Sequence, residues 1–415
     1  MPESGTAPTH RARPLPGIDG HIRDHRAAVA SGFAGWLLDS FDFFLVTFCL
    51  TAIAKEFHRS DAQVALVITA TLAFRPVGGF VFGMLADRYG RRIPFMANVA
   101  LFAFIEIGTG LASSFVALLT MRCLFGVVMG GQWGVGASMA MEKAPARRRG
   151  MLSGLLQEGY AAGSVMAALS YFSLFGRFGW RPLFFLGTVP ALLLVLFAYF
   201  RVGESEVWKL STKRSWKEQG REVASHWKLF LYLVAFMTAM LLASHGTQDM
   251  YPTFLQRQWH FSPMRRSAIT ACAGVGAIIG GIVVGHLSDR WGRRRSMIGA
   301  FILAIFAIPL WSFARSEVTL IVGAFVMQFL VQGAWGVVPA HLAELSPNSV
   351  RAFLPGFAYQ TAGVIAGSVV YIEALFAQRS SYAIAMALTA ITVFTLASVV
   401  AALGRERLGH TFLDS

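Results

Sequence analysis

The chain has 415 residues, of which 55% are apolar and only 14% carry a charged side chain. A soluble domain carries about 25% charged residues, so this composition excludes both an ordinary soluble protein and a disordered one. The three cysteines are too few for a disulfide scaffold. The net charge of +14 fits either nucleic-acid binding or basic loops beside a membrane, and the positions of the charged residues distinguish the two.

Apolar stretches long enough to cross a lipid bilayer recur along the whole chain. A transmembrane helix needs about 20 mostly apolar residues. Because backbone groups without hydrogen bonds are costly in lipid, we expect these stretches to be helices. The sequence therefore predicts an all-α polytopic membrane protein with twelve transmembrane helices. The predicted helices cover 28–54, 63–86, 94–112, 115–141, 150–175, 181–201, 228–255, 266–288, 296–314, 317–341, 352–377 and 382–404.

Polar segments divide these helices into two groups of six. The segment 1–27 is polar and lacks the apolar core of a cleaved signal peptide, so it is predicted to be a tail. The charged linker 202–227 separates a bundle formed by 28–201 from a second bundle formed by 228–404. The segment 405–415 is predicted to be a second tail.

Arginine runs determine the expected orientation. Arg91-Arg92, Arg147-Arg148-Arg149 and Arg293-Arg294-Arg295 all fall on the side of the membrane that carries the two tails. Because loops rich in Lys and Arg stay in the cytoplasm, we expect both termini to be cytoplasmic and the protein to span a bacterial inner membrane several times. Topology explains most of the basic excess, so nucleic-acid binding is not expected.

One segment of the chain recurs at a fixed distance. The residues GMLADRYGRR at 83–92 return as GHLSDRWGRR at 285–294, which is 202 residues later. The same offset relates Trp133 to Trp335, and it relates the Glu-to-Arg segment 142–149 to 344–351. Several separate segments that share one offset indicate that the chain is a parallel repeat of two six-helix halves.

The repeated segment resembles the loop signature of the major facilitator superfamily, and the resemblance extends over nearly the whole chain. It implies two six-helix bundles around a central cavity that rock to give alternating access. The charged residues of the repeat lie at the cytoplasmic helix ends, where they suit a gate rather than a substrate site. The expected gating residues are Asp87, Arg88, Arg91, Glu142, Arg149, Asp289, Arg290, Glu344 and Arg351.

Ionisable side chains at membrane depth cost at least about 2.5–3.5 kcal/mol each, so each is a candidate for function. Arg75 is the main substrate candidate, because a guanidinium stays charged and its planar fork fits a carboxylate. The alternative is an internal ion pair with Asp39 or Asp42. The full set is Asp39, Asp42, Arg75, Glu106, Arg122, Glu158, His245, Asp249 and Glu373.

A histidine and an aspartate lie one helical turn apart in the seventh predicted helix. His245 and Asp249 therefore share one helical face, and such a pair can hold and release one proton near neutral pH. Gln248 is adjacent to them. We expect Asp249 and His245 to handle the proton, and His245 and Gln248 to contact the substrate.

The segment 244–253, SHGTQDMYPT, resembles the helix-seven signature N-x-x-[ST]-H-x-[ST]-Q-D-x-x-x-T of the fungal lactate/pyruvate permeases in the sialate:proton symporter family. The one departure is Leu241, where the signature has Asn. The resemblance implies a proton-coupled monocarboxylate carrier. It also implies a substrate role for Gln360 in helix eleven.

Three further positions are placed by similarity to related symporters. Asp39 and Asp42 resemble an acidic helix-one pattern, and they are expected to take part in proton coupling. Gln132 stands in a Gly-Gly-Gln-Trp-Gly segment where relatives have Glu, so it cannot carry a proton, and we place it among the substrate-binding residues.

The leading hypothesis is a proton-coupled symporter that imports small monocarboxylates such as lactate or pyruvate. The alternative from the same class is a proton symporter for sialic acid, an aromatic acid or another organic acid; a drug exporter and a transporter-like sensor are further readings. Neither an enzyme nor a cofactor is expected, and Cys49, Cys123 and Cys272 show no metal-ligand spacing. The expected partners are a small organic anion, a proton and the lipid bilayer, and the protein is expected to be monomeric.

Overall fold

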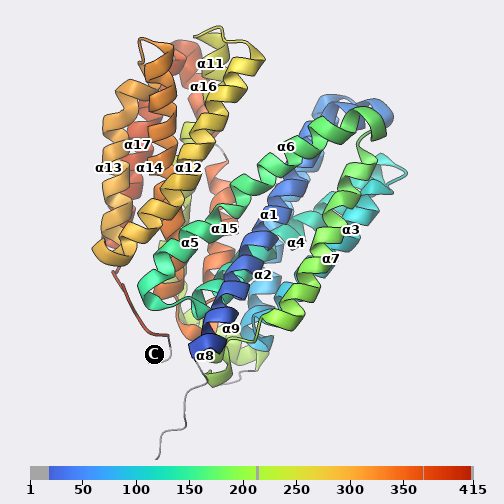
Figure 1. Cartoon of the computed structure of the whole chain (residues 1–415), viewed down its shortest axis with the longest axis vertical. Coiled ribbons are helices and arrows are strands. Elements are labelled where there is room, and N and C mark those ends of the chain that lie inside the picture. The colour runs from blue at the N-terminus through green and yellow to red at the C-terminus, as the bar shows by residue number, and fades with distance from the viewer. Residues whose placement is uncertain (1–17, 212–214, 368, 413–415) are drawn as a thin grey trace, which may run out of the picture.

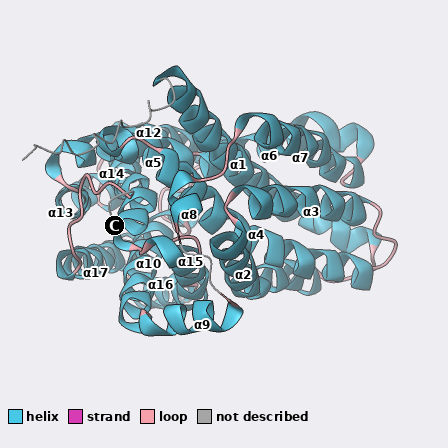
Figure 2. Cartoon of the chain, turned by 90° about the horizontal axis from the view of Figure 1, so that it is seen from below, coloured by secondary structure: helices cyan, strands magenta, loops and turns pink. Residues whose placement is uncertain are grey.

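The computed structural model describes residues 18–211, 215–367 and 369–412, and within these ranges the chain forms helices without any strand (Figures 1 and 2). Ten helices in these ranges are long and apolar enough to cross a membrane. The prediction of an all-α polytopic membrane protein is confirmed. Residues 1–17 of the predicted tail 1–27 lie outside the described ranges, whereas the first helix already begins at Ile18.

The helices fall into an N half and a C half that repeat the same order. The N half contains α1 (Ile18–Glu56), α2 (Asp61–Tyr89), α3 (Arg92–Gly110), α4 (Phe115–Lys143), η1 (Ala146–Arg148), α5 (Arg149–Gln157), α6 (Gly159–Phe178) and α7 (Arg181–Arg201). The linker holds α8 (Glu206–Leu210) and α9 (Trp216–Ser225). The C half contains α10 (Trp227–Gln248), α11 (Tyr251–Arg257), α12 (Pro263–Trp291), α13 (Arg293–Ser312), α14 (Glu317–Leu345), η2 (Asn348–Val350), α15 (Phe353–Ala366), α16 (Val369–Arg379) and α17 (Tyr382–Leu403).

Three predicted helices are interrupted rather than continuous. The predicted helix 150–175 breaks at Glu158 between α5 and α6, 228–255 breaks between α10 and α11, and 352–377 breaks between α15 and α16. Pro252 explains the second break, because proline suits the first turn of α11 but its ring blocks a preceding helical turn. Apolar content alone could not show these breaks.

The two halves meet at one end of the molecule and diverge towards the other (Figure 1). At the meeting end α5 packs against α12 and α14, while α15 packs against α2 and α4. Glycines allow the close approach: a Cβ atom on Gly154 would lie 2.1 Å from the Gly281 carbonyl oxygen, and one on Gly134 would lie 2.7 Å from the Gly356 Cα. Larger residues at these points would force the halves apart.

The linker helices lie at this same end, which we call the linker end (Figure 2). Trp208 of α8 donates its indole N–H to the Asp87 carbonyl at 3.0 Å, and Gln219 of α9 donates to the Met84 carbonyl at 2.9 Å. Ser349 of the C half donates to Glu222 at 2.9 Å. The polar linker is therefore attached to both halves.

Candidate functional site

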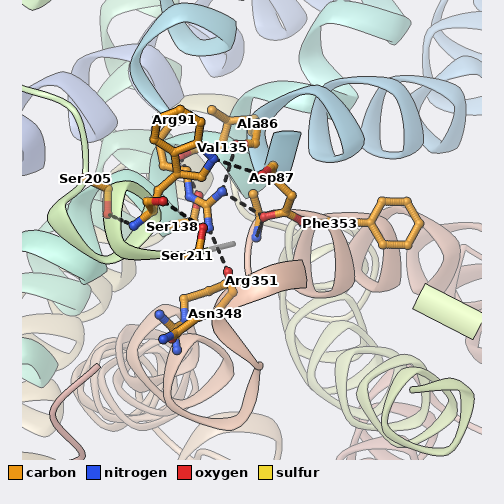
Figure 3. A network of polar contacts seen from close by, with 12 residues as sticks. Ala86, Asp87, Arg91, Val135, Ser138, Ser205, Ser211, Asn348, Arg351 and Phe353 are labelled. Carbon is orange, nitrogen blue, oxygen red and sulfur yellow. Dashed lines mark hydrogen bonds and ion pairs between the residues drawn. The ribbon is translucent and has the colours of Figure 1, made fainter. Parts of the chain in front are cut away.

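Two aspartates at the linker end cap helices of the opposite half. Asp87 ends α2 and accepts the backbone N–H groups of Ala352 and Phe353 at 3.0 and 2.9 Å, at the start of α15 (Figure 3). Asp289 ends α12 and accepts those of Gly150 and Met151 at 2.8 and 3.1 Å, at the start of α5. Helix N-termini carry free N–H groups and partial positive charge, so each carboxylate holds the two halves together.

Around Asp87 lies a buried ionic network. Arg91 forms ion pairs with two carboxylates: its Nη1 lies 2.9 Å from Asp87 Oδ1, and its Nη2 lies 2.8 Å from Glu142 Oε1. Nη1 of Arg351, in the C half, lies 3.8 Å from the same Glu142 oxygen. Glu204 accepts the backbone N–H of Arg91 at 2.8 Å, at the start of α3. We call Asp87, Arg91, Glu142, Glu204 and Arg351 the Asp87 set.

The repeat builds the same network a second time. Arg293 forms the equivalent ion pairs: its Nη1 lies 2.7 Å from Asp289 Oδ1, and its Nη2 lies 3.0 Å from Glu344 Oε1. Nη1 of Arg149, in the N half, lies 2.9 Å from the same Glu344 oxygen. Glu406 accepts the backbone N–H of Arg293 at 3.1 Å. These five residues, the Asp289 set, are related to the first set by the offset of 202, with Arg149 and Arg351 exchanged between halves.

The arginines of the Asp87 set remain charged at neutral pH. Burial lowers the pKa of Arg351, and Glu142 offsets this only in part, so that the pKa is about 10. Burial also opposes the charge on Arg91, but Glu142 and Asp87 raise its pKa above the ordinary value for arginine. Both arginines therefore stay positively charged throughout the physiological range.

The two networks differ from the gating residues expected from the sequence. They include two residues that were not expected, and they lack two that were. Glu204 and Glu406 were missed, although the offset of 202 pairs them and would have found them. Arg88 lies over the Trp216 ring, with Cζ 4.5 Å from the ring centroid, and Arg290 is exposed. Neither Arg88 nor Arg290 belongs to the Asp87 set or the Asp289 set.

Arg75 lies where the two halves meet. Its Cζ lies 5.4 Å from the centroid of the Tyr359 ring, which belongs to α15 of the C half. Its Nε is buried without a hydrogen-bond partner, and no carboxylate of the described ranges forms an ion pair with it. Asp39 interacts with Arg75 electrostatically but stays beyond ion-pair distance. The guanidinium therefore keeps hydrogen-bond donors for an anion.

Asp42 is engaged elsewhere. Its Oδ2 lies 2.5 Å from Nη1 of Arg122, whose second terminal nitrogen contacts the Thr109 hydroxyl at 2.5 Å and Glu106 at 3.6 Å. All four side chains are buried inside the N half. The structure thus separates the two expected proton-coupling residues of helix one, since Asp42 binds Arg122 and Asp39 does not.

His245 and Asp249, which the sequence places on one helical face, are in contact. His245 Nδ1 lies 3.0 Å from Asp249 Oδ2, and the two side chains are 43% and 37% exposed. Asp249 stands at the end of α10, so the chain break exposes it. Gln248 instead donates to Gln328 of α14 at 2.8 Å, inside the C half.

The two remaining predicted substrate residues are buried. Gln132 lies beside Asp39 and Asn98, and its amide makes no hydrogen bond to any described residue. Gln360 donates to the Gly130 carbonyl at 3.0 Å, across the two halves. In this arrangement Gln360 joins α15 to α4.

Aromatic rings that the sequence analysis did not single out surround Tyr359. The ring centroids of Trp133, Trp335 and Trp36 lie 4.8, 6.1 and 6.3 Å from that of Tyr359. Tyr160 lies 5.2 Å from Trp36. Aromatic residues are common in apolar helices and form no periodic pattern here, so only the pairing of Trp133 with Trp335 in the repeat could have drawn attention to them.

Known proteins resemble this chain over most of its length. A family model described as Major Facilitator Superfamily matches residues 32–249 and 247–411. The chain is 28% identical to the carboxylic acid transporter protein homolog of Saccharomyces cerevisiae, over 92% of this chain and 68% of that protein. It is 27% identical to the sialic acid transporter NanX of Escherichia coli, over 93% and 95%. It is 31% identical to the probable 4-methylmuconolactone transporter of Cupriavidus pinatubonensis, over 83% and 82%.

A solved structure shows the same fold. The proton:xylose symporter XylE superimposes with a TM-score of 0.77 over 95% of this chain and 98% of that one, at 17% identity. At this identity the likeness shows the fold alone. The family match and the transporters among the relatives identify the chain as a transporter and not an enzyme. The chain belongs to the major facilitator superfamily.

Proposed function

We propose that this transporter is a proton-coupled symporter that imports small monocarboxylates, such as lactate or pyruvate, by alternating access. The observation that carries the proposal is Arg75, whose guanidinium lies within a membrane-spanning helix and forms no ion pair with a carboxylate of the described residues. An uncompensated charge at this depth is costly, so it is retained for a ligand. A carboxylate matches the fork of its N–H groups.

The proton is assigned to helix seven. His245 and Asp249 contact each other at 3.0 Å and are partly exposed, so a proton can reach them from the surroundings. A monoanion that enters with one proton carries no net charge, and the pH gradient drives its uptake. Asp39, beside the same Arg75, is a second proton-coupling candidate in the N half.

The linker end is proposed as the cytoplasmic gate, with both termini in the cytoplasm of a bacterial cell and the protein in its inner membrane as a monomer. The Asp87 and Asp289 sets join opposite halves, so both must break before the substrate can leave on this side. The described arrangement is thus closed to the cytoplasm. Alternating access then consists of breaking these contacts while the divergent ends of the halves approach each other.

A second candidate is a proton symporter for a larger organic acid. Relatives named as transporters of sialic acid and cis,cis-muconate support it, and any carboxylate could bind Arg75. The aromatic rings around Tyr359 are compatible with a flat, unsaturated acid.

One experiment separates these candidates. The protein is reconstituted in proteoliposomes and supplied with labelled lactate, pyruvate, sialic acid and cis,cis-muconate, with an acidic exterior and with equal pH on both sides. We expect accumulation of a monocarboxylate only with the acidic exterior. Accumulation of sialic acid or muconate alone would replace the substrate assignment, and accumulation of every acid without a pH gradient would refute proton coupling.

A further inference from the structure

We propose that Tyr359 is a positioning residue for Arg75 and that it gives the carboxylate site its high affinity while the linker end is closed. This inference rests on the proposed binding of an organic acid to Arg75. Tyr359 and Arg75 belong to opposite halves, so their contact depends on the arrangement of the halves. The distance of 5.4 Å between Arg75 Cζ and the ring centroid is in the range of a cation–π contact.

The Tyr359 ring is itself held in place. It is 8% exposed, and indoles of both halves surround it. Trp133 donates its N–H to Gln157 at 3.1 Å, and Trp335 donates its N–H to the Met240 carbonyl at 3.1 Å. Rings fixed in this way leave Tyr359 little freedom, so the guanidinium above it is ordered before a substrate arrives.

A contact with a ring face orders the guanidinium without using its hydrogen-bond donors. An ion pair with Asp39 would neutralise Arg75 and occupy the fork that a carboxylate needs, whereas the Tyr359 ring does neither. The buried and unpartnered Nε of Arg75 agrees with this. Tyr359 therefore lowers the cost of ordering the long side chain and leaves its binding capacity intact.

The contact also links affinity to the gate. Tyr359 lies on α15, whose first residues are held by Asp87 of α2, and α2 carries Arg75. When the linker end opens, α15 separates from α2 and Tyr359 leaves Arg75. The carboxylate site then loses its ordered guanidinium on the side where the substrate must dissociate.

The test measures the affinity of the purified protein for labelled pyruvate, or for whichever acid is transported in the proteoliposome experiment. We expect Tyr359→Phe to bind within about twofold of the parent, because the ring is kept, and Tyr359→Leu to raise Kd about tenfold. Tyr171→Leu removes a half-buried aromatic ring that stacks on Phe175 of α6, and this matched control should leave Kd unchanged. Should Tyr359→Leu not fold, Tyr359→Met should show the same rise.

Two outcomes distinguish failure of this inference from failure of the proposed function on which it rests. Unchanged affinity in folded Tyr359→Leu, together with lost binding in Arg75→Ala, would overturn the role of Tyr359 and leave the carboxylate site standing. Unchanged affinity in Arg75→Ala would overturn the carboxylate site itself. Equal losses in Tyr359→Phe and Tyr359→Leu would assign the effect to the hydroxyl, which also overturns the ring contact.

We infer, independently of the substrate, that the C-terminal segment is a latch on the proposed gate. Residues 404–412 follow α17 and run along the linker end (Figure 1). The Phe412 ring is 4% exposed and lies between two arginines, with ring centroid to Cζ distances of 3.9 Å for Arg149 and 3.8 Å for Arg351. These arginines belong to opposite halves.

Further contacts fix the latch on both sides. Arg149 donates to the His410 carbonyl at 3.1 Å, and Asn348 of the C half donates to the Phe412 carbonyl at 2.9 Å. Phe412 shares a small apolar cluster with Met141 of the N half and Ala343 of the C half. A ring that attracts two like-charged guanidiniums offsets their repulsion, and it can do so only while the halves are together.

The test uses thiol alkylation as a reporter of opening. Ser153 is buried on α5 and accepts the Ala340 N–H at 3.0 Å across the halves, so Ser153→Cys becomes reactive when the linker end opens. It is placed in a chain without its native thiols, and N-ethylmaleimide is applied. The native thiols to be replaced are Cys49, Cys123 and Cys272.

Loss of the latch should favour the open gate. We expect Phe412→Ala, and truncation after residue 407, to raise the alkylation rate about tenfold, while Phe412→Trp keeps it near the parent rate. Phe313→Ala, at an aromatic ring that is 49% exposed, should have no effect. A parent rate in both latch variants, with a raised rate in Asp87→Asn to show that the reporter responds, would overturn the latch.

Discussion

At the scale of single residues, two arginines at membrane depth differ in what surrounds them. Arg122 is neutralised by Asp42 at 2.5 Å, with Glu106 at 3.6 Å, and all three side chains are buried. Arg75 has a ring face as its neighbour and forms no ion pair with any described residue. Each Nε is buried without a hydrogen-bond partner, so the difference lies in the charge: carboxylates neutralise Arg122, whereas the charge of Arg75 remains available to an anion. This difference supports the proposal that Arg75 binds the substrate, whereas Arg122 forms a structural ion pair.

Replacing Arg75 by lysine tests the geometry of this site at constant charge. We expect Arg75→Lys to weaken carboxylate binding about 10- to 100-fold, because an ammonium cannot form the paired N–H contacts. Equilibrium binding of the transported acid by purified protein measures it. Arg177→Lys, at an exposed arginine in the last turn of α6, is the matched control. Parent affinity in Arg75→Lys would remove the bidentate contact from the mechanism.

Asp249 permits a separation of transport from coupling. Asn resembles the protonated form of Asp249 permanently, so Asp249→Asn should abolish accumulation driven by a pH gradient while substrate exchange across the membrane continues. Proteoliposomes with labelled acid measure both quantities. Glu317→Gln, at a partly exposed carboxylate 3.9 Å from Arg265, should change neither. Undiminished accumulation by well-folded Asp249→Asn would show that another group carries the proton.

At the scale of elements, interrupted helices determine what the two halves share. The break between α5 and α6 and the break between α15 and α16 create short helices that cross to the opposite half. Each begins at the linker end with free N–H groups, which Asp289 and Asp87 accept. Arg293 and Arg91 form ion pairs with these same two carboxylates. Each contact between the halves is therefore stabilised both by an ion pair and by a helix cap.

The repeat predicts equivalent effects at its two aspartates. Asp87→Asn and Asp289→Asn each remove the charge from a helix cap and an ion pair, so both should weaken the closed linker end and slow the return of the empty transporter. We expect turnover to fall about tenfold in each, with affinity for the acid reduced at most about threefold, because a weaker linker end also weakens the contact between Tyr359 and Arg75. Uptake kinetics and equilibrium binding distinguish the two quantities. A large loss of affinity in either variant would place that aspartate in the substrate site.

At the scale of the whole molecule, several contacts join the two halves and depend on their present arrangement. Three features require the present arrangement of the two halves. They are the ion pairs of the Asp87 and Asp289 sets, the contact between Tyr359 and Arg75, and the position of Phe412 between Arg149 and Arg351. We therefore expect opening of the linker end to release the proposed gate and to weaken the proposed substrate site together.

Charge balance leads to a prediction about the driving force. A monoanion and one proton move no net charge, so the membrane potential, which supplies about 2.3 kcal/mol per charge for each 100 mV, should neither drive nor oppose uptake. We expect an imposed potential of about 100 mV to change the initial rate less than twofold. Valinomycin and potassium gradients set the potential, and an acidic exterior is the positive control. A strong response to potential would require a different number of protons.

The apolar stretches determined the fold class, because lipid permits helices alone. The repeat at 202 residues determined most residues of both ionic networks, because equivalent loops carry the same charged groups. The offset even relates Glu204 to Glu406, which the pattern search overlooked. Hydropathy could not show where helices break, since Glu158 and Asp249 lie inside apolar stretches.

Pairing was decided by the tertiary structure. Asp39 and Asp42 are one helical turn apart, yet Asp42 binds Arg122 and Asp39 lies near Arg75. Tyr359 and Phe412 acquire their contacts only where two halves, separated by hundreds of residues, come within a few ångströms. A sequence lists which groups can interact, whereas the free energy of burying a charge depends on the distance to its partner, and only the folded chain sets that distance.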